Sequence, residues 1–361
     1  MSVTEKLNGY GPLNGVKVVE LCEWVAAPAT VRVLSEMGAE IIKVEPLHGD
    51  AQRTQGPGFG CEQTDREDPT IDLNNTNKNW LALNLKTPEG SKVMHQLLAT
   101  ADVFVNNLRD KALVKLGFDY ATLKEKYPTL LWAQMRGYGE CGPERDTPGF
   151  DAVCWAARGG VANVFREDGE SPAIPPQAFG DYNAASILSG GILAALFNRT
   201  RTGKGDKVTC NLYGAAIWGG NIGVMATQFG APYPKSRKHV PNPFNNTYKT
   251  KDDKWMLICM PQYDKYDNMM MEITGNAARI SPTPATCPRS RRPASSPRSS
   301  AGSRRRSPPR RSRNGTRSCA STRCPTRSAS ATPTSSRTKR PTTTTPCAGL
   351  NTKRSARRPS P

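Results

Sequence analysis

The chain has 361 residues, and its formal net charge of +19 is unevenly distributed. Residues 276–361 hold 21 basic and no acidic residues, so residues 1–275 hold the other 29 basic and all 31 acidic ones, a net charge of about −2. A near-neutral segment of this length can bury one or two cores, and its charge gives no reason to expect nucleic acid or a membrane surface as partner. Because no apolar run approaches membrane-spanning length and no signal peptide is visible, we expect a soluble, cytoplasmic protein.

Residues 276–361 form a tail of different composition. The tail lacks Phe, Tyr, Trp, Val and Met, so it cannot bury enough apolar surface to offset chain entropy and is expected to be disordered. Three interpretations are open: an Arg-rich arm that binds nucleic acid non-specifically, a solvated linker, or out-of-frame sequence. The composition favours the third, because Arg, Pro, Ser, Thr and Ala have GC-rich codons and dominate when GC-rich DNA is read in the wrong frame.

Short apolar runs alternate with helical patterns along residues 16–212. In chain order the predicted strands are Val16–Leu21, Glu40–Val44, Leu81–Leu85, Val103–Val105, Leu130–Met135 and Lys207–Leu212. The predicted helices are Ala29–Met37, Pro88–Thr100, Lys111–Leu116, Tyr120–Lys126 and Tyr182–Arg199. The strand–helix–strand order implies a parallel sheet and an α/β, Rossmann-like fold.

Two further local patterns bear on the fold and on the ligand. Thr247–Lys249 and Trp255–Cys259 are typical of a hairpin around a charged turn. The turn after the first strand, residues 22–28, carries no glycine fingerprint, so a dinucleotide site is not expected.

The sequence around Gly180 and Asp181 places a carboxylate just before a long helical pattern. One interpretation is an N-cap, because Asp accepts hydrogen bonds from the free N–H groups of a helix start. The other is an anionic nucleophile held by neighbouring backbone amides. Local sequence alone favours the N-cap.

Cationic and amide side chains recur at predicted strand ends or in the turns that follow. They are Lys78, Asn107, Arg109, Lys115 and Arg136. Each could be an ordinary solvated surface group. Alternatively they bind phosphate, because anions favour N–H groups and cations beyond the carboxyl ends of parallel strands. The six cysteines of residues 1–275 include no CxxC pair and have no His nearby at metal-ligand spacing, so no metal site is predicted.

Seven blocks occur in one order along residues 13–275. They are GVKVVEL, LSEMGAEIIKVEP, NNTNK, ADVFVNNLRDKALVKLG, MRGYGECGP, FGDYNAA and TGKGDKV. In order and spacing they resemble the class III coenzyme A (CoA) transferases, which include formyl-CoA and carnitine-CoA transferases. The FGDYNAA block is most similar to the branch that acts on (R)-2-hydroxy acids such as 2-hydroxyisocaproate or phenyllactate.

The resemblance implies a reaction and a set of site residues. The catalytic aspartate of the family falls on Asp181, which overturns the N-cap interpretation, and Asp151 and Gly180 fall on supporting positions. The implied contacts to CoA are Val25, Ala26, Lys78, Asn107, Arg109, Lys115, Arg136 and Gly137. The implied chemistry exchanges CoA between an acyl-CoA and a free carboxylic acid through an aspartyl anhydride and an aspartyl-CoA thioester. CoA thioesters enter as substrates, and no permanently bound cofactor is expected.

The resemblance also implies a domain division. We expect a large domain over 1–215, the start of an incomplete smaller domain over 216–275, and the tail over 276–361. The family forms an interlocked homodimer, and much of what builds it would fall after residue 275. The composition change there leaves open an inactive, frameshifted remnant of the enzyme.

A racemase acting on α-methylacyl-CoA is a related alternative. It needs a His–Asp couple, and its histidine belongs where this chain has Phe150. The histidines present, His48, His95 and His239, do not occupy that place. Because Phe cannot transfer a proton, the sequence disfavours this reading.

Overall fold

A six-stranded parallel sheet forms the centre of the fold. The computed structural model describes residues 10–64, 67–240 and 242–275. The strands are β1 (Lys17–Leu21), β2 (Glu40–Glu45), β3 (Asn79–Ala82), β4 (Val103–Asn106), β5 (Leu131–Arg136) and β6 (Lys207–Asn211). They are ordered β3-β2-β1-β4-β5-β6, and each neighbouring pair is parallel. The predicted α/β parallel-sheet class is confirmed, although β3 begins two residues before the predicted strand.

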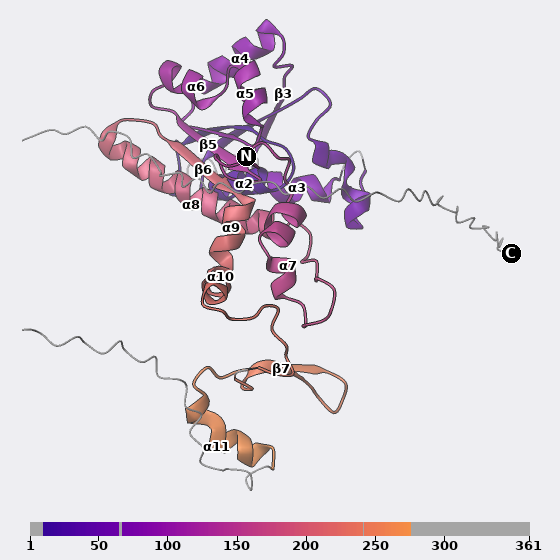
Figure 1. Cartoon of the computed structure of the whole chain (residues 1–361). Coiled ribbons are helices and arrows are strands. Elements are labelled where there is room, and N and C mark those ends of the chain that lie inside the picture. Colours follow the sequence, from indigo (N-terminus) through magenta and orange to yellow (C-terminus); the bar gives the residue numbers. More distant parts are fainter. Residues whose placement is uncertain (1–9, 65–66, 241, 276–361) are drawn as a thin grey trace, which may run out of the picture. The chain divides into compact units, whose positions relative to one another are not determined.

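Helices cover both faces of this sheet. Before β6 they are α2 (Ala26–Glu36), α3 (Pro69–Asn75), α4 (Pro88–Leu98), α5 (Asp110–Leu116), α6 (Tyr120–Lys126), α7 (Val161–Val164) and α8 (Phe179–Thr202), with short turns η1 (Ala51–Thr54) and η2 (Gly56–Phe59) and a π-helix η3 (Ala152–Arg158). Figure 1 shows α4, α5 and α6 on one side of the sheet and α2 and α8 on the other.

The two hydrophobic cores follow from the alternation of side chains along the strands. In β4, Val103 and Val105 pack into the core under α2 and α8, while Phe104 packs into the core under α4, α5 and α6. In β5, Leu131 and Trp132 divide between the cores in the same way. Because successive residues of a strand face opposite sides, continuously apolar strands require both faces to be covered.

Helix α8 begins earlier than the sequence predicts. It starts at Phe179, after Ala178 in a left-handed conformation with φ 62°. Asp181 therefore lies inside the first turn and is not the N-cap residue, which corrects that interpretation. The helix ends at Thr202, where Gly203 takes the left-handed conformation that commonly stops a helix.

The chain continues after β6 with α9 (Leu212–Gly219), α10 (Asn221–Gln228) and the hairpin β7 (Asn245–Lys249) and β8 (Trp255–Cys259), followed by α11 (Tyr263–Ile273). The hairpin is antiparallel, as predicted. All described residues fall in one compact unit, residues 1–282. The division at residue 215 stays a prediction, and the tail lies outside the described residues.

A buried ionic network lies among the first strands and the turns that follow them. Lys43 Nζ contacts Glu20 Oε1 at 3.1 Å and Asp50 Oδ2 at 3.0 Å, and Lys78 Nζ contacts Glu20 Oε2 at 2.8 Å. The side chains of these four residues are 0% exposed. Burial alone would lower the pKa of Lys43, but the charges of Glu20 and Asp50 raise it above its usual range. Each charge in the network therefore depends on its partners.

Replacing Lys43 by Met tests this dependence. The substitution leaves Glu20 and Asp50 short of a buried cation, so we expect the free energy of unfolding to fall by about 3–5 kcal/mol. Urea denaturation followed by circular dichroism measures the change. Lys249→Met is the matched control, because its ion pair with Asp253 is exposed and such pairs contribute about 0–1 kcal/mol. Equal losses in both variants would contradict the prediction.

Candidate functional site

A pocket of about 330 Å³ opens beyond the carboxyl ends of β1, β4 and β5. In the sheet, β2 lies on one side of β1 and β4 lies on the other. The strands before β4 are therefore added in one direction and the later strands in the opposite direction, and the pocket lies at the point where this direction changes. Ligands of open α/β sheets bind at such a switch point. The lining comes from the β1–α2 turn, the ends of β4 and β5, the loop of residues 145–150, and the start of α8.

The β1–α2 turn is held in an uncommon backbone conformation. Trp24 has φ 67°, a left-handed value that costs a non-glycine residue about 1–2 kcal/mol. Its N–H donates to Asp50 Oδ1 at 3.1 Å. Asn107 Oδ1 accepts from the Glu23 N–H at 3.2 Å, and Asn107 Nδ2 donates to the Glu23 carbonyl at 2.6 Å. Asn107, which the sequence predicts as a CoA contact, lines the pocket and also fixes this turn.

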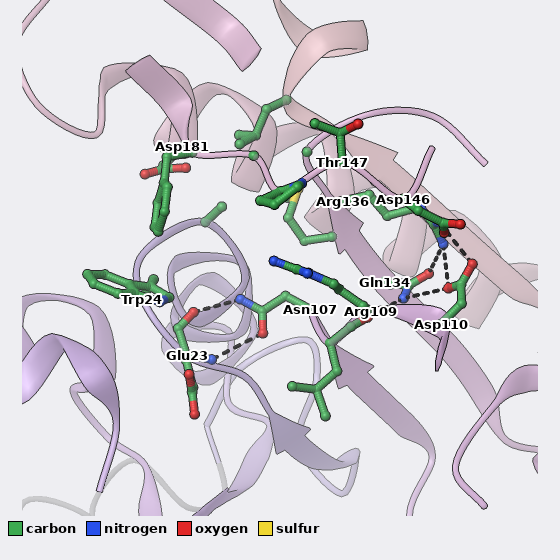
Figure 2. Close-up of a pocket in the computed structure, with 18 of the residues that line it drawn as sticks. Glu23, Trp24, Asn107, Arg109, Asp110, Gln134, Arg136, Asp146, Thr147 and Asp181 are labelled. Carbon is green, nitrogen blue, oxygen red and sulfur yellow. Dashed lines mark hydrogen bonds and ion pairs between the residues drawn. The ribbon is translucent and has the colours of Figure 1, made fainter. Parts of the chain in front are cut away.

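Asp181 lies at the pocket from the first turn of α8 (Figure 2). Burial, and then the negative charge of Asp151, raise the pKa of this carboxyl group to about 7. Among the described residues, no cation forms an ion pair with it. A carboxylate that is poorly solvated and unpaired is a better nucleophile than one in water.

Asp151 caps the helix that carries Asp181. Its carboxylate accepts from the Gly180 N–H at 3.0 Å, which satisfies an N–H group left free at the start of a helix. Burial raises the pKa of Asp151, although its hydrogen bonds with the backbone of Gly180 and Asp181 oppose that rise. The predicted supporting pair, Asp151 and Gly180, is thus brought together directly beside Asp181.

The predicted cationic residues divide into those inside the pocket and those outside it. Arg109 points its guanidinium group into the pocket, as Figure 2 shows. Arg136 lines the pocket too, but Asp110 engages it at 2.7 and 3.0 Å. Lys115 is exposed on α5, away from the lining residues.

Lys78 lies in the buried ionic network and not in the pocket lining. Its Nζ also donates to the Pro28 carbonyl and to Asn75 Oδ1, both at 2.9 Å. Burial lowers the pKa of Lys78 to about 8, against the opposing charge of Glu20. The side chain holds the start of α2 in place. Val25, Ala26 and Gly137, by contrast, do line the pocket as predicted.

Sequence reasoning missed several residues of the site. Trp24, Asp110 and Arg145 line the pocket, and Asp50 orients Trp24 from the buried network. Trp24 and Asp110 lie next to the predicted CoA contacts Val25 and Arg109 in the chain, and this adjacency was the one sequence signal that could have identified them. Nothing local in the sequence marks Asp50, because its role depends on the fold. Within the described part of the chain, no group of three or more Cys, His, Asp or Glu could hold a metal ion.

Comparison with known families assigns the class of protein. The family model described as CoA-transferase family III matches residues 13–296. The chain therefore belongs to CoA-transferase family III. The match ends inside the tail whose composition differs from the rest. None of the helices in the described segments is both long and apolar enough to cross a membrane.

Two curated relatives are each 44% identical to the chain. A cinnamoyl-CoA:phenyllactate CoA-transferase of Clostridium sporogenes matches over 271 residues, 74% of this chain and 66% of the relative. A (R)-2-hydroxy-4-methylpentanoate CoA-transferase of Clostridioides difficile matches over 254 residues, 70% of this chain and 64% of the relative. The chain thus spans slightly less than two thirds of the length of these relatives.

Solved structures agree with the fold. A CAIB/BAIF family protein from Brucella suis superposes with a TM-score of 0.63 at 28% identity, over 74% of this chain and 70% of that chain. A protein from Mycobacterium tuberculosis gives a TM-score of 0.64 at 27% identity, over 76% of this chain and 71% of that one. The fold is therefore shared with both of these proteins of known structure.

Gly180→Ala tests how tightly the start of α8 is packed. A Cβ at Gly180 would lie 2.4 Å from Trp155 Cγ, and Trp155 is buried. We expect a loss of about 1–3 kcal/mol in the free energy of unfolding, because overpacking forces neighbours to move. Gly190→Ala in the same helix is the control, since nothing lies within 4 Å of its Cβ position. That variant should gain about 0.5–1 kcal/mol. Urea denaturation of both variants measures the contrast, and a neutral Gly180→Ala would contradict it.

Proposed function

We propose that this chain is a CoA transferase that moves CoA between an acyl-CoA and a free 2-hydroxy carboxylic acid, with Asp181 as nucleophile. The observation that carries the proposal is the half-buried Asp181 carboxyl group at the sheet's switch point, which has no ion-pair partner among the described residues and a pKa raised to about 7. The names of the two relatives at 44% identity support the 2-hydroxy acid.

The proposed reaction passes through three successive covalent intermediates on Asp181. The carboxylate attacks the thioester carbonyl of the donor and expels the CoA thiolate, which leaves an aspartyl–acyl anhydride. The thiolate then attacks the aspartyl carbonyl, which forms an aspartyl-CoA thioester and releases the donor acid. The acceptor acid attacks this thioester and regenerates thiolate and anhydride. Attack of the thiolate on the acyl carbonyl gives the new acyl-CoA and frees Asp181.

Backbone N–H groups at the start of α2 are the best placed to stabilise the oxyanion of each step. The Gly180 N–H, which lies next to Asp181 in the chain, already donates to Asp151. The first hydrogen bond of α2 runs from the Ala29 N–H to the Val25 carbonyl, so the amides of Val25 and Ala26 precede the hydrogen-bonded turns. Both residues line the pocket. Donors fixed in advance at a developing negative charge are a large source of rate enhancement.

The phosphates of CoA require cationic partners. Arg109 is the strongest candidate, because its guanidinium group points into the pocket and forms no ion pair within the described residues. Arg136 already forms an ion pair with Asp110, so a phosphate would have to share this guanidinium group with Asp110. The buried position of Lys78 makes it a positioning residue for α2 instead of a phosphate contact.

The racemase alternative lacks its base at this site. Phe150 lines the pocket where a histidine would be needed, and none of the lining residues is a histidine. The inactive-remnant alternative is separated from the proposal by experiment.

Asp181→Asn should abolish transfer and the covalent intermediate. Wild-type chain incubated with cinnamoyl-CoA should gain the mass of one CoA less one water, and Asp181→Asn should not, with turnover reduced by roughly 10³-fold or more. Intact-protein mass spectrometry and a CoA-exchange assay with phenyllactate measure both. Asp168→Asn, at an exposed carboxylate outside the pocket, is the matched control. Absence of both adduct and turnover in the wild type would favour the inactive remnant.

The pH dependence should report the raised pKa of Asp181. Only the carboxylate attacks, so kcat/KM should rise with pH and level off above about 7. Asp151→Asn keeps an oxygen that accepts the Gly180 N–H but removes the negative charge that helps to raise the pKa. The rise of kcat/KM with pH should therefore move to lower pH in this variant. It should not reach the pH range of an ordinary carboxyl group, because the burial of Asp181 still raises its pKa. A rise unmoved by Asp151→Asn would contradict the assigned cause.

A further inference from the structure

We propose that Trp24 and Phe150 select the acyl group. The two rings form an apolar wall beside Asp181 that favours acids with an aryl or branched alkyl group over short acids and dicarboxylic acids. This inference rests on the proposed function, because it assumes that the acyl carbonyl carbon must lie within reach of the Asp181 carboxylate.

The two rings come from segments far apart in the chain and meet in the pocket. Trp24 belongs to the β1–α2 turn, and Phe150 follows Gly149 in the loop after β5. Their centroids are 5.2 Å apart at an interplanar angle of 84°, the edge-to-face arrangement that aromatic pairs favour. Both residues line the same pocket as Asp181, and Figure 2 shows Trp24 and Asp181 on one side of it.

The exposure of Phe150 indicates that the wall has an apolar occupant. The residue is 56% exposed, although it lies within a lining rich in charged groups such as Glu23, Arg109 and Asp146. Exposed apolar surface inside a binding pocket is typical of a ligand contact. An aryl or branched alkyl group placed against this wall would remove the ring from water.

The backbone that carries Trp24 is held in place before any ligand arrives. The left-handed Trp24 is held by Asp50, which the buried Lys43 anchors in turn. Strained backbone that the surroundings enforce is characteristic of functional positions. Because the backbone that carries the Trp24 ring is already fixed, contact with the ring costs less conformational entropy than contact with a ring on a mobile loop.

The charges around the pocket work against a second carboxylate on the substrate. Arg136 is engaged by Asp110, and Arg145 lies 3.7 Å from Asp146. Glu23 and Asp181 add negative charge, which leaves Arg109 as the unpaired cation among the described lining residues. A dicarboxylic acid would therefore place its second charge near unneutralised carboxylates.

Binding to the Asp181→Asn variant tests the wall independently of the chemistry. Isothermal titration with cinnamoyl-CoA, acetyl-CoA and succinyl-CoA should show cinnamoyl-CoA bound roughly tenfold more tightly than either of the others. Phe150→Ala in that background should remove most of the preference and leave the affinity for acetyl-CoA within about twofold. Phe150→Tyr keeps the ring and should retain the preference. Phe229→Ala, at an aromatic residue 86% exposed outside the pocket, is the control.

The outcomes separate the two proposals. The aromatic wall is overturned if the preference for cinnamoyl-CoA survives Phe150→Ala or if the protein shows no preference among the thioesters. It is also overturned if none of the thioesters binds. Failure of the Asp181 chemistry appears elsewhere, as absence of the CoA adduct in the wild-type chain. A pocket that discriminates among thioesters without forming the adduct would support the wall and reject the nucleophile.

Discussion

The buried ionic network of Glu20, Lys43, Asp50 and Lys78 is the constraint on which the site depends. Taking four charges out of water is costly, and a network of this kind persists only where each charge has well-placed partners. One anion of the network, Asp50, also accepts from the Trp24 N–H, and one cation, Lys78, donates to the Pro28 carbonyl at the start of α2. The backbone of the β1–α2 turn is therefore held by contacts from this network and from Asn107.

A second coupling joins the start of α8 to the reactivity of Asp181. Asp151 satisfies the Gly180 N–H and at the same time raises the pKa of Asp181 through its negative charge. Close packing of Gly180 on Trp155 leaves no room for a side chain there. Helix capping, packing and the pKa of Asp181 thus depend on neighbouring contacts of Asp151, Gly180 and Trp155. Such coupling makes the effects of individual substitutions non-additive.

The sheet could be predicted from the sequence because each strand is a short apolar run, and runs buried on both faces signal a parallel sheet. The structural positions of Lys78 and Asp181 were harder to predict from the sequence. Charge alone suggests a solvated or ligand-binding lysine, and only the tertiary arrangement shows that Lys78 meets Glu20 in the interior. The helix start at Phe179 depends on a cap supplied from residue 151 and on a left-handed Ala178. Neither is visible in a local pattern, so propensity placed the boundary three residues late.

Every group in the proposed reaction comes from the sheet unit that ends with β6 and α9. The pocket lining runs from Glu23 to Leu212, and the ionic network lies within residues 20–78. Large apolar side chains beyond that unit are exposed instead, among them Phe229, Trp255 and Leu257. Exposed apolar surface of this kind affects association and stability, whereas the proposed nucleophile, oxyanion donors and acyl wall come from the β1–α2 turn, the loop after β5 and the start of α8. Every residue assigned to the proposed site therefore precedes α10.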